Sequence, residues 1–278
     1  MIQALAVLLP VVYAAAAALA LVHFLGLERR APPRGLPIAR LGTIAFTSAL
    51  TLHVVLFAAR AAAVGAVPSF DGWWSISALA LVLGALHFAV AARQDARGTD
   101  PLVLGTVFLA QLTASAAASF EVTAAPERPV PFYLLHVMSI LVASGALMLS
   151  GLHGLLYLVL FRQMRLRRFG PLFERLPPLD RLAHLMRRTA LAAFILLVIG
   201  TNGGIWWAHA ASVPGFNYGD PGVLLSLGLC VYFAAIAFSA RIPGATARRT
   251  SLAAAIGLLL LVASLSLFLM DSSFHWTR

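Results

Sequence analysis

The sequence contains no lysine, only one cysteine and only ten acidic residues. Charged residues make up 11% of its 278 positions, whereas hydrophobic residues make up 61%, and the mean hydropathy is +0.91. A soluble domain needs more charge than this on its surface. The composition therefore excludes a soluble globular protein and indicates an integral membrane protein.

The single cysteine, Cys230, lies inside an apolar segment. One cysteine excludes an intramolecular disulfide and a C-x-x-C pair, so the protein does not itself transfer electrons by thiol exchange. The absence of lysine leaves arginine as every basic residue. We interpret this as the codon bias of a GC-rich genome and not as a feature of the mechanism.

Eight apolar segments divide the chain. They are residues 3–26, 41–64, 75–92, 102–120, 132–161, 189–209, 222–240 and 251–270. Most reach or approach the roughly 20 apolar residues with which a helix crosses the hydrocarbon layer. We therefore predict an all-α bundle of eight transmembrane helices in a single membrane domain, residues 1–278. In the fifth span Ala146, Ser150 and Gly154 recur at four-residue spacing, a row of small residues that allows another helix to approach closely.

The arginines are concentrated in every second gap between these spans. The gaps after spans one, three, five and seven contain 17 of the 20 basic residues. Because basic residues are retained on the cytoplasmic side, we expect these gaps to be cytoplasmic and both termini to lie outside the inner membrane of a bacterium. Topology and contact with anionic membrane lipid then explain the net charge of +10, so we expect no nucleic-acid partner.

The longest cytoplasmic gap follows the fifth span. Its Arg/Leu pattern from 169 to 188 is partly amphipathic, and Pro171, Pro177 and Pro178 interrupt it. Proline breaks a helix interior. We therefore predict a short amphipathic helix from about Leu179 onward that lies on the inner membrane surface.

Three histidines fall near the outer ends of three different spans. His136 opens span five, His209 closes span six, and His275 lies just past span eight. Aromatic residues share this depth; they are Trp206, Trp207, Phe216, Tyr218, Phe274 and Trp276. Neutral imidazoles fill the two axial positions of a haem iron, and flat aromatic rings cover the macrocycle. The pattern indicates a haem site at the outer face.

Other interpretations of these histidines stay open at this point. A His₃ zinc site is one alternative, although it would leave the aromatic residues unused. The carboxylates on the outer side are Asp71, Glu121, Glu127, Asp220 and Asp271. Histidine is also acceptable at a membrane interface without any special role. His53 and His153 lie nearer to mid-membrane, where they either mark function or form hydrogen bonds between helices.

Only three arginines lie outside the cytoplasmic gaps: Arg60 in span two, Arg128 before span five, and Arg278 at the C-terminus. Haem propionates need charge-assisted donors, which arginine supplies in bidentate geometry. Because an unpaired charge in lipid is costly, we expect Arg60 to face the bundle interior or the histidine site. Arg128 is a second candidate donor, and Arg278 is expected to be a tail.

Several segments of the C-terminal half occur in a characteristic order. They are YLLHVMSI (133–140), LLYL (155–158), LPPLDRL (176–182), GGIW (203–206), DP (220–221), LLSL (224–227) and FHW (274–276). In this order they resemble the cytochrome c assembly family of haem-handling membrane proteins, in particular its HemX-like branch with eight spans. The resemblance covers about residues 132–278. Spans one to four match only as apolar helices, apart from residues 52–54.

The resemblance implies that haem, expected as haem b, is held at the outer face between His136 and His275. Family synthetases cradle haem with a tryptophan-rich segment, but here residues 216–220 take its place and Tyr218 replaces a tryptophan. This departure argues against attachment of haem to apocytochrome, and we assign no enzymatic activity. The implied role is assistance in cytochrome c maturation or in haem homeostasis. Implied partners are haem and, beyond it, apocytochrome c or other cytochrome c assembly proteins.

Two functions from other classes remain as alternatives. A small-molecule transporter would require broken helices and ionisable groups at mid-membrane, whereas the only acidic residue near a span interior is Asp271, at an edge. A structural subunit of a membrane complex would use the histidines for packing. The absorbance of the purified protein separates a haem protein from a scaffold.

Overall fold

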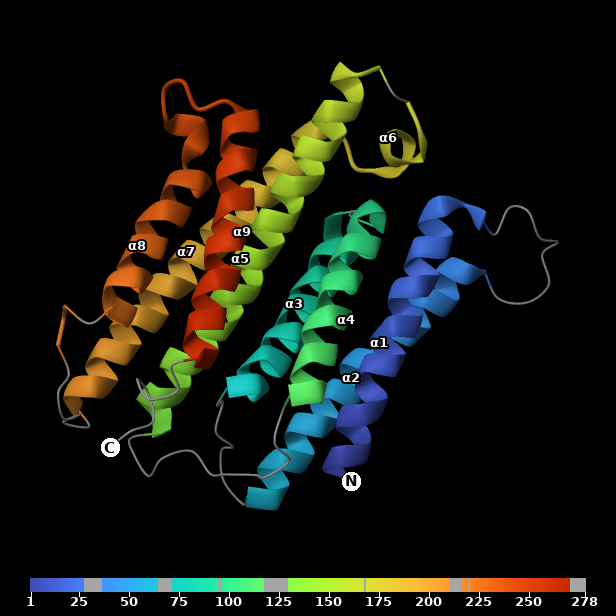
Figure 1. Ribbon diagram of the computed structural model, residues 1–278. Helices are drawn as coiled ribbons and strands as arrows, with labels where there is room; N and C mark the ends of the chain where they lie inside the picture. Colours follow the sequence, from blue (N-terminus) through green and yellow to red (C-terminus); the bar gives the residue numbers. More distant parts are fainter. Residues whose placement is uncertain are drawn as a thin grey trace. The chain divides into compact units, whose positions relative to one another are not determined.

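The computed structural model describes residues 1–27, 37–64, 72–94, 97–117, 130–167, 169–210, 217–219 and 221–270. Every regular element in these residues is helical, as predicted (Figure 1). The α-helices are α1 (Ile2–Leu25), α2 (Ile38–Val64), α3 (Gly72–Gln94), α4 (Asp100–Ala117), α5 (Val130–Arg165), α6 (Pro171–Arg175), α7 (Leu179–Ala210), α8 (Pro221–Ala237) and α9 (Ala247–Met270). Two 3₁₀ turns, η2 (Arg97–Thr99) and η3 (Ser239–Arg241), precede α4 and α9.

Seven of the described helices are long and apolar enough to cross a membrane: α1 to α5, α7 and α9. Helix α8, at the place of the predicted seventh span, has 17 residues, or about 26 Å of rise. This is a few ångströms short of the hydrocarbon thickness, a mismatch that bilayers accommodate at modest cost. The protein is a polytopic all-α membrane bundle. The count of eight spans and the outer position of both termini stay predictions.

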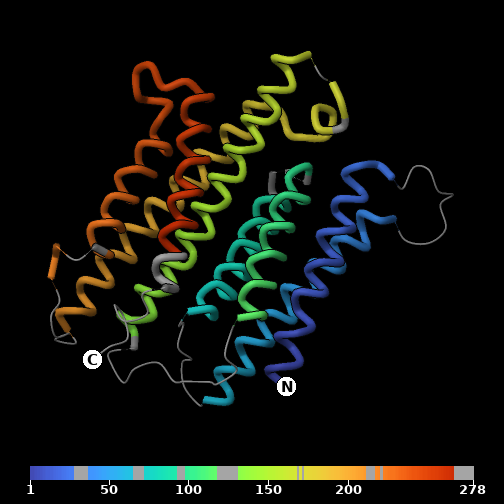
Figure 2. Tube along the Cα trace, viewed as in Figure 1, coloured from blue at the N-terminus to red at the C-terminus, as the bar shows by residue number. Residues whose placement is uncertain are grey.

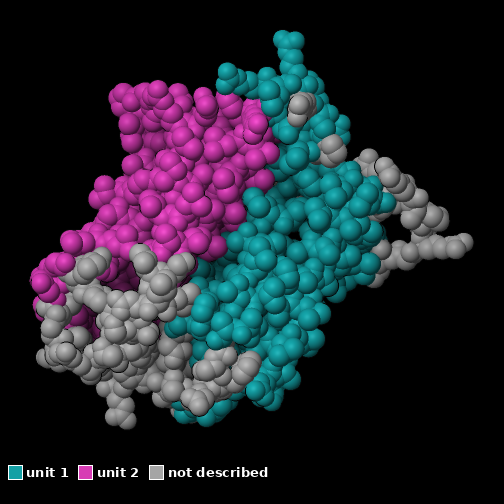
Figure 3. Space-filling view, viewed as in Figure 1, with its two compact units in different colours: residues 1–125, 163–177 teal, residues 126–162, 178–278 magenta. Residues whose placement is uncertain are grey.

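The chain divides into two compact units, coloured separately in Figure 3. Unit 1 comprises Met1–Ala125 and Gln163–Pro177, and unit 2 comprises Pro126–Arg162 and Pro178–Arg278. A single domain over residues 1–278 stays a prediction. In unit 1, α1 and α2 run side by side as an antiparallel pair (Figure 2), and α4 packs against both α1 and α3.

A chain of buried polar side chains connects all four long helices of unit 1. Ser77 on α3 donates its hydroxyl hydrogen to Gln111 on α4 at 2.9 Å, so its oxygen accepts from Nε2–H of His53 on α2 at 3.0 Å. His53 Nδ1 then accepts from the hydroxyl of Tyr13 on α1 at 3.1 Å. Gln111 donates to Ser115, which donates to the Ala6 carbonyl on α1. His53 thus forms hydrogen bonds between helices, the second of the roles considered for it.

The segment after α5 packs onto the end of α1 within unit 1. The Arg175 guanidinium donates to the His23 and Phe24 carbonyls, which are among the last carbonyls of α1, and the His23 carbonyl also accepts the N–H of the cap residue Gly26. A Cβ at Gly98 would collide with the Arg175 carbonyl oxygen. The absence of a side chain at Gly98 therefore allows this segment to dock closely.

The amphipathic segment differs from the prediction. Instead of a separate surface helix from about Leu179, residues 179–188 form the first turns of α7, which continues to Ala210. Leu182, Leu185 and Met186 are buried, so this apolar face packs inside the protein. The short separate helix, α6, occurs earlier, and Pro178 supplies the first carbonyl acceptor of α7.

In unit 2, α5 packs closely against two partners. Ser150 donates its hydroxyl to the Met186 carbonyl of α7 at 3.0 Å. A Cβ at Gly154 would lie 2.8 Å from the Ser251 carbonyl oxygen of α9, and one at Gly151 would lie 2.5 Å from the Leu258 Cβ. The row of small residues on α5 therefore brings the backbones of three helices together.

Candidate functional site

His136 lies near the start of α5 and faces α7. Its Nδ1 is 2.8 Å from the Gly200 carbonyl oxygen. A carbonyl only accepts hydrogen bonds, so Nδ1 carries the hydrogen and Nε2 carries the lone pair. Metal-binding histidines commonly donate their second ring N–H to a carbonyl in this way, which sets the tautomer and the ring orientation.

Glycines on α7 make room for this ring. A Cβ at Gly204 would lie 2.5 Å from Nδ1 and 2.7 Å from Cε1 of His136. One turn earlier, a Cβ at Gly200 would lie 2.8 Å from the Ile140 Cδ1. The imidazole therefore lies directly against the α7 backbone, and any side chain at Gly204 would displace it.

Two pairs of aromatic rings extend the α5–α7 contact beyond His136. Phe132 and Trp206 have ring centroids 5.8 Å apart, and Tyr133 and Trp207 have centroids 5.9 Å apart. The Trp206 side chain is 65% exposed, whereas Trp207 is half-buried. Tilted ring contacts of this kind stabilise the α5–α7 pair.

His209 and Tyr218 contact each other at the end of α7. The His209 Nε2 and the Tyr218 hydroxyl are 2.8 Å apart, and both side chains are exposed. Gly204 and His209 are five residues apart on α7, which corresponds to about 7.5 Å along the helix axis. His209 is therefore more than one turn from the His136 ring, and its Nε2 is engaged with the Tyr218 hydroxyl.

Arg60 lies in the interior of unit 1. The residue is 0% exposed, and its guanidinium carbon is 3.7 Å from the Trp74 ring centroid and 6.0 Å from that of Phe57. The stacking on Trp74 is a cation–π contact that offsets part of the cost of burying the charge. Arg60 belongs to unit 1 and His136 to unit 2, so a shared role of the two stays a prediction.

Several candidate residues lie outside the described part of the chain: His275, Trp276, Phe216, Phe274, Arg128 and Arg278. The predicted pair of His136 and His275 therefore stays a prediction. Among the residues that the structure describes, no group of three or more His, Cys, Asp or Glu could hold a metal ion. His153 on α5 is fully buried.

Sequence reasoning missed the parts of the site that carry no functional group. Gly200 and Gly204 shape the surface against which His136 lies, and Phe132 and Tyr133 pair with the tryptophans. The available signal was the spacing of Gly200, Gly203 and Gly204 just before two tryptophans. Glycines three and four residues apart lie on one face of a helix and permit close approach.

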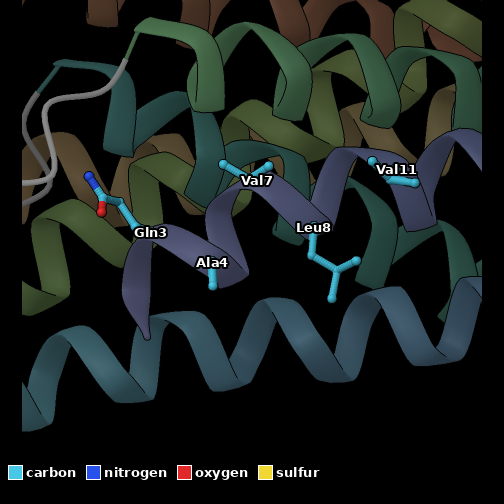
Figure 4. A pocket seen from close by; sticks show the side chains of 5 residues that line it. All are labelled: Gln3, Ala4, Val7, Leu8 and Val11. Carbon is cyan, nitrogen blue, oxygen red and sulfur yellow. The ribbon is translucent and has the colours of Figure 1, made fainter.

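A depression on the surface of unit 1 follows α1 alone. It is lined by Gln3, Ala4, Val7, Leu8 and Val11 (Figure 4). All five side chains are exposed, as expected for a helix face toward lipid. Its lining contains no titratable group.

Comparison with protein families identifies the chain. The family model "Cytochrome C assembly protein" matches residues 15–275. The chain belongs to this family. The match extends well before residue 132, so the first four spans are part of the family region too. No curated protein and no solved structure matches the chain. Membership assigns the protein to cytochrome c maturation at the membrane, in a family that is associated with haem.

Proposed function

We propose that this protein is a HemX-like member of the family that binds haem b near its outer face. In this role it assists cytochrome c maturation or haem homeostasis, with apocytochrome c or other assembly proteins as partners. His136 and His275 are the proposed axial ligands. The observation that carries the proposal is the hydrogen bond from His136 Nδ1 to the Gly200 carbonyl, because it directs the lone pair to Nε2.

The residues around His136 fit a flat, largely apolar group. Gly204 presents bare backbone to one edge of the imidazole. On α5, Phe132 and Tyr133 lie about one turn before His136, and their ring partners Trp206 and Trp207 follow Gly204 on α7. Haem would supply an iron that binds imidazole nitrogens, and His136 and His275 would provide them. The Gly200 carbonyl orients His136 with the lone pair on Nε2, and the nearby aromatic rings would contact the macrocycle.

Arg60 and Arg128 are the proposed donors to the haem propionates, and Phe216, Tyr218 and Trp276 complete the proposed aromatic surroundings. Arg60 is buried on the Trp74 ring, which agrees with the expectation that it faces away from lipid. A buried guanidinium keeps its charge and binds carboxylates with two parallel hydrogen bonds. His209 ranks behind His136 as a ligand because its Nε2 contacts Tyr218.

The absorbance of the purified protein tests this proposal. The wild type should show a Soret band, His136→Ala should lose most of the haem, and His209→Ala should keep most of it. His184→Ala is the matched control, because His184 is an exposed histidine on α7. A colourless wild-type protein would favour a scaffold, and full haem content in His136→Ala would show that the ligand is another residue.

A further inference from the structure

Positive charge is concentrated at certain helix ends of unit 2. Described arginines lie at the end of α5, the start of α7, the turn after α8 and the start of α9; they are Arg162, Arg181, Arg187, Arg188, Arg241, Arg248 and Arg249. The only carboxylate of unit 2 in the described residues is Asp180. We call these seven residues the arginine patch. Its charge is far from balanced within unit 2.

Contacts within unit 2 bring parts of the patch together. The Arg248 guanidinium carbon lies 5.7 Å from the Phe161 ring centroid, so the start of α9 is next to Arg162 at the end of α5. Arg241 lies over Phe238 at 5.5 Å, and Arg249 Nη1 donates to the Gly244 carbonyl at 3.3 Å. Arg248 therefore lies beside the end of α5, while Arg241 and Arg249 pack on the turn between α8 and α9.

The N-terminal end of α9 adds to the positive electrostatic potential of the arginine patch. Arg248 and Arg249 lie in the first turn of α9, which contains no acidic residue. The N-terminal end of a helix is itself positive, so cations there are unfavourably placed. An anion next to these arginines would remove the repulsion.

Apolar neighbours of the arginines indicate which anion the patch fits. Phe238, Ile242 and Leu252 are 37%, 45% and 53% exposed, and each is within four residues of an arginine of the patch. Exposed apolar side chains beside guanidinium groups are typical of the boundary between hydrocarbon and head groups. A soluble acidic partner would leave these side chains in water.

We propose that the arginine patch binds the head groups of anionic phospholipids. Arginine binds phosphodiester oxygens in bidentate geometry, while the neighbouring apolar side chains contact the acyl chains. Each arginine close to an anionic membrane surface contributes a factor of about five in binding. This proposal does not depend on haem binding.

Native mass spectrometry of the full chain, titrated with phosphatidylglycerol, phosphatidylcholine or inorganic phosphate, tests it. The wild type should retain phosphatidylglycerol in preference to phosphatidylcholine. Arg248→Gln should lower that retention about fivefold, and the triple variant Arg241→Gln/Arg248→Gln/Arg249→Gln should abolish the preference. The lysine variant Arg248→Lys should keep part of it, which separates charge from misfolding.

Asn202→Ala is the control, because Asn202 is an exposed polar residue on α7 outside the arginine patch. This variant should retain both lipids like the wild type. Equal retention of both lipids by the wild type would overturn the proposal, as would an equal loss in Asn202→Ala or unchanged retention in the triple variant. Displacement of phosphatidylglycerol by inorganic phosphate at equal concentration would show a phosphate site and not a lipid site.

Discussion

Replacing Gly204 by alanine tests the geometry around His136 with the smallest possible change. The added Cβ would lie 2.5 Å from the imidazole Nδ1, whereas ordinary contacts begin near 3.4 Å. The ring must therefore move by about 0.9 Å or the two helices must separate. A shift of that size along the bond to the Gly200 carbonyl, now 2.8 Å, takes the distance beyond the range of hydrogen bonds.

The loss of this hydrogen bond should weaken haem binding. Removing the partner that orients a ligating histidine typically lowers affinity 10- to 100-fold, or about 1.4–2.7 kcal/mol. The fold itself should change less, because overpacking costs about 1–3 kcal/mol while alanine regains about 1 kcal/mol of helix propensity over glycine. Titration of the purified variant with haem, followed at the Soret band, measures the first effect, and thermal unfolding measures the second.

Gly228→Ala is the matched control for this prediction. Gly228 lies on α8, and a Cβ there would meet no atom within 4 Å. The control should bind haem like the wild type and should be equally or slightly more stable. The reasoning fails if Gly204→Ala binds haem as tightly as Gly228→Ala.

Three further predictions concern unit 1. His53→Ala should lower the stability by about 2–5 kcal/mol in denaturant unfolding, because it leaves two buried hydrogen-bonding groups unsatisfied; haem content should not change, and a stable variant would contradict the role of the buried chain. Arg60→Gln should lower the free energy of unfolding by about 1–2 kcal/mol, because the contact with Trp74 is lost. Unchanged haem affinity in this variant would exclude the propionate role. Gly98→Val should release the Arg175 segment and increase its cleavage by trypsin, unlike Gly105→Ala, where a Cβ has open space.

Hydrophobicity alone was enough to predict most of the architecture. An 18-residue apolar stretch has few stable alternatives to a membrane helix, so seven of the predicted spans match long described helices.

The start of α7 was not predictable in this way, because an amphipathic segment can lie on a membrane or pack against protein. Leu182 and Met186 are buried, and only tertiary contacts decide this.

The site was predictable only where a side chain has recognisable chemistry. His136 was found from its depth and its neighbours, and Arg60 from its position within an apolar span. Gly200 and Gly204 were missed, because their contribution is the absence of a side chain at a helix contact whose partner the sequence does not reveal. The same limit applies to His53, whose hydrogen-bond partners lie on two other helices.

The measurement that tests the central claim most directly is the ligand state of the haem iron, read by electron paramagnetic resonance of the oxidised, haem-loaded protein. The account predicts a low-spin signal from two imidazole ligands in the wild type. That signal should be lost in His136→Ala and in His275→Ala, because neither variant keeps both imidazole ligands. An unchanged low-spin signal in either variant would contradict the claim that His136 and His275 hold the haem together.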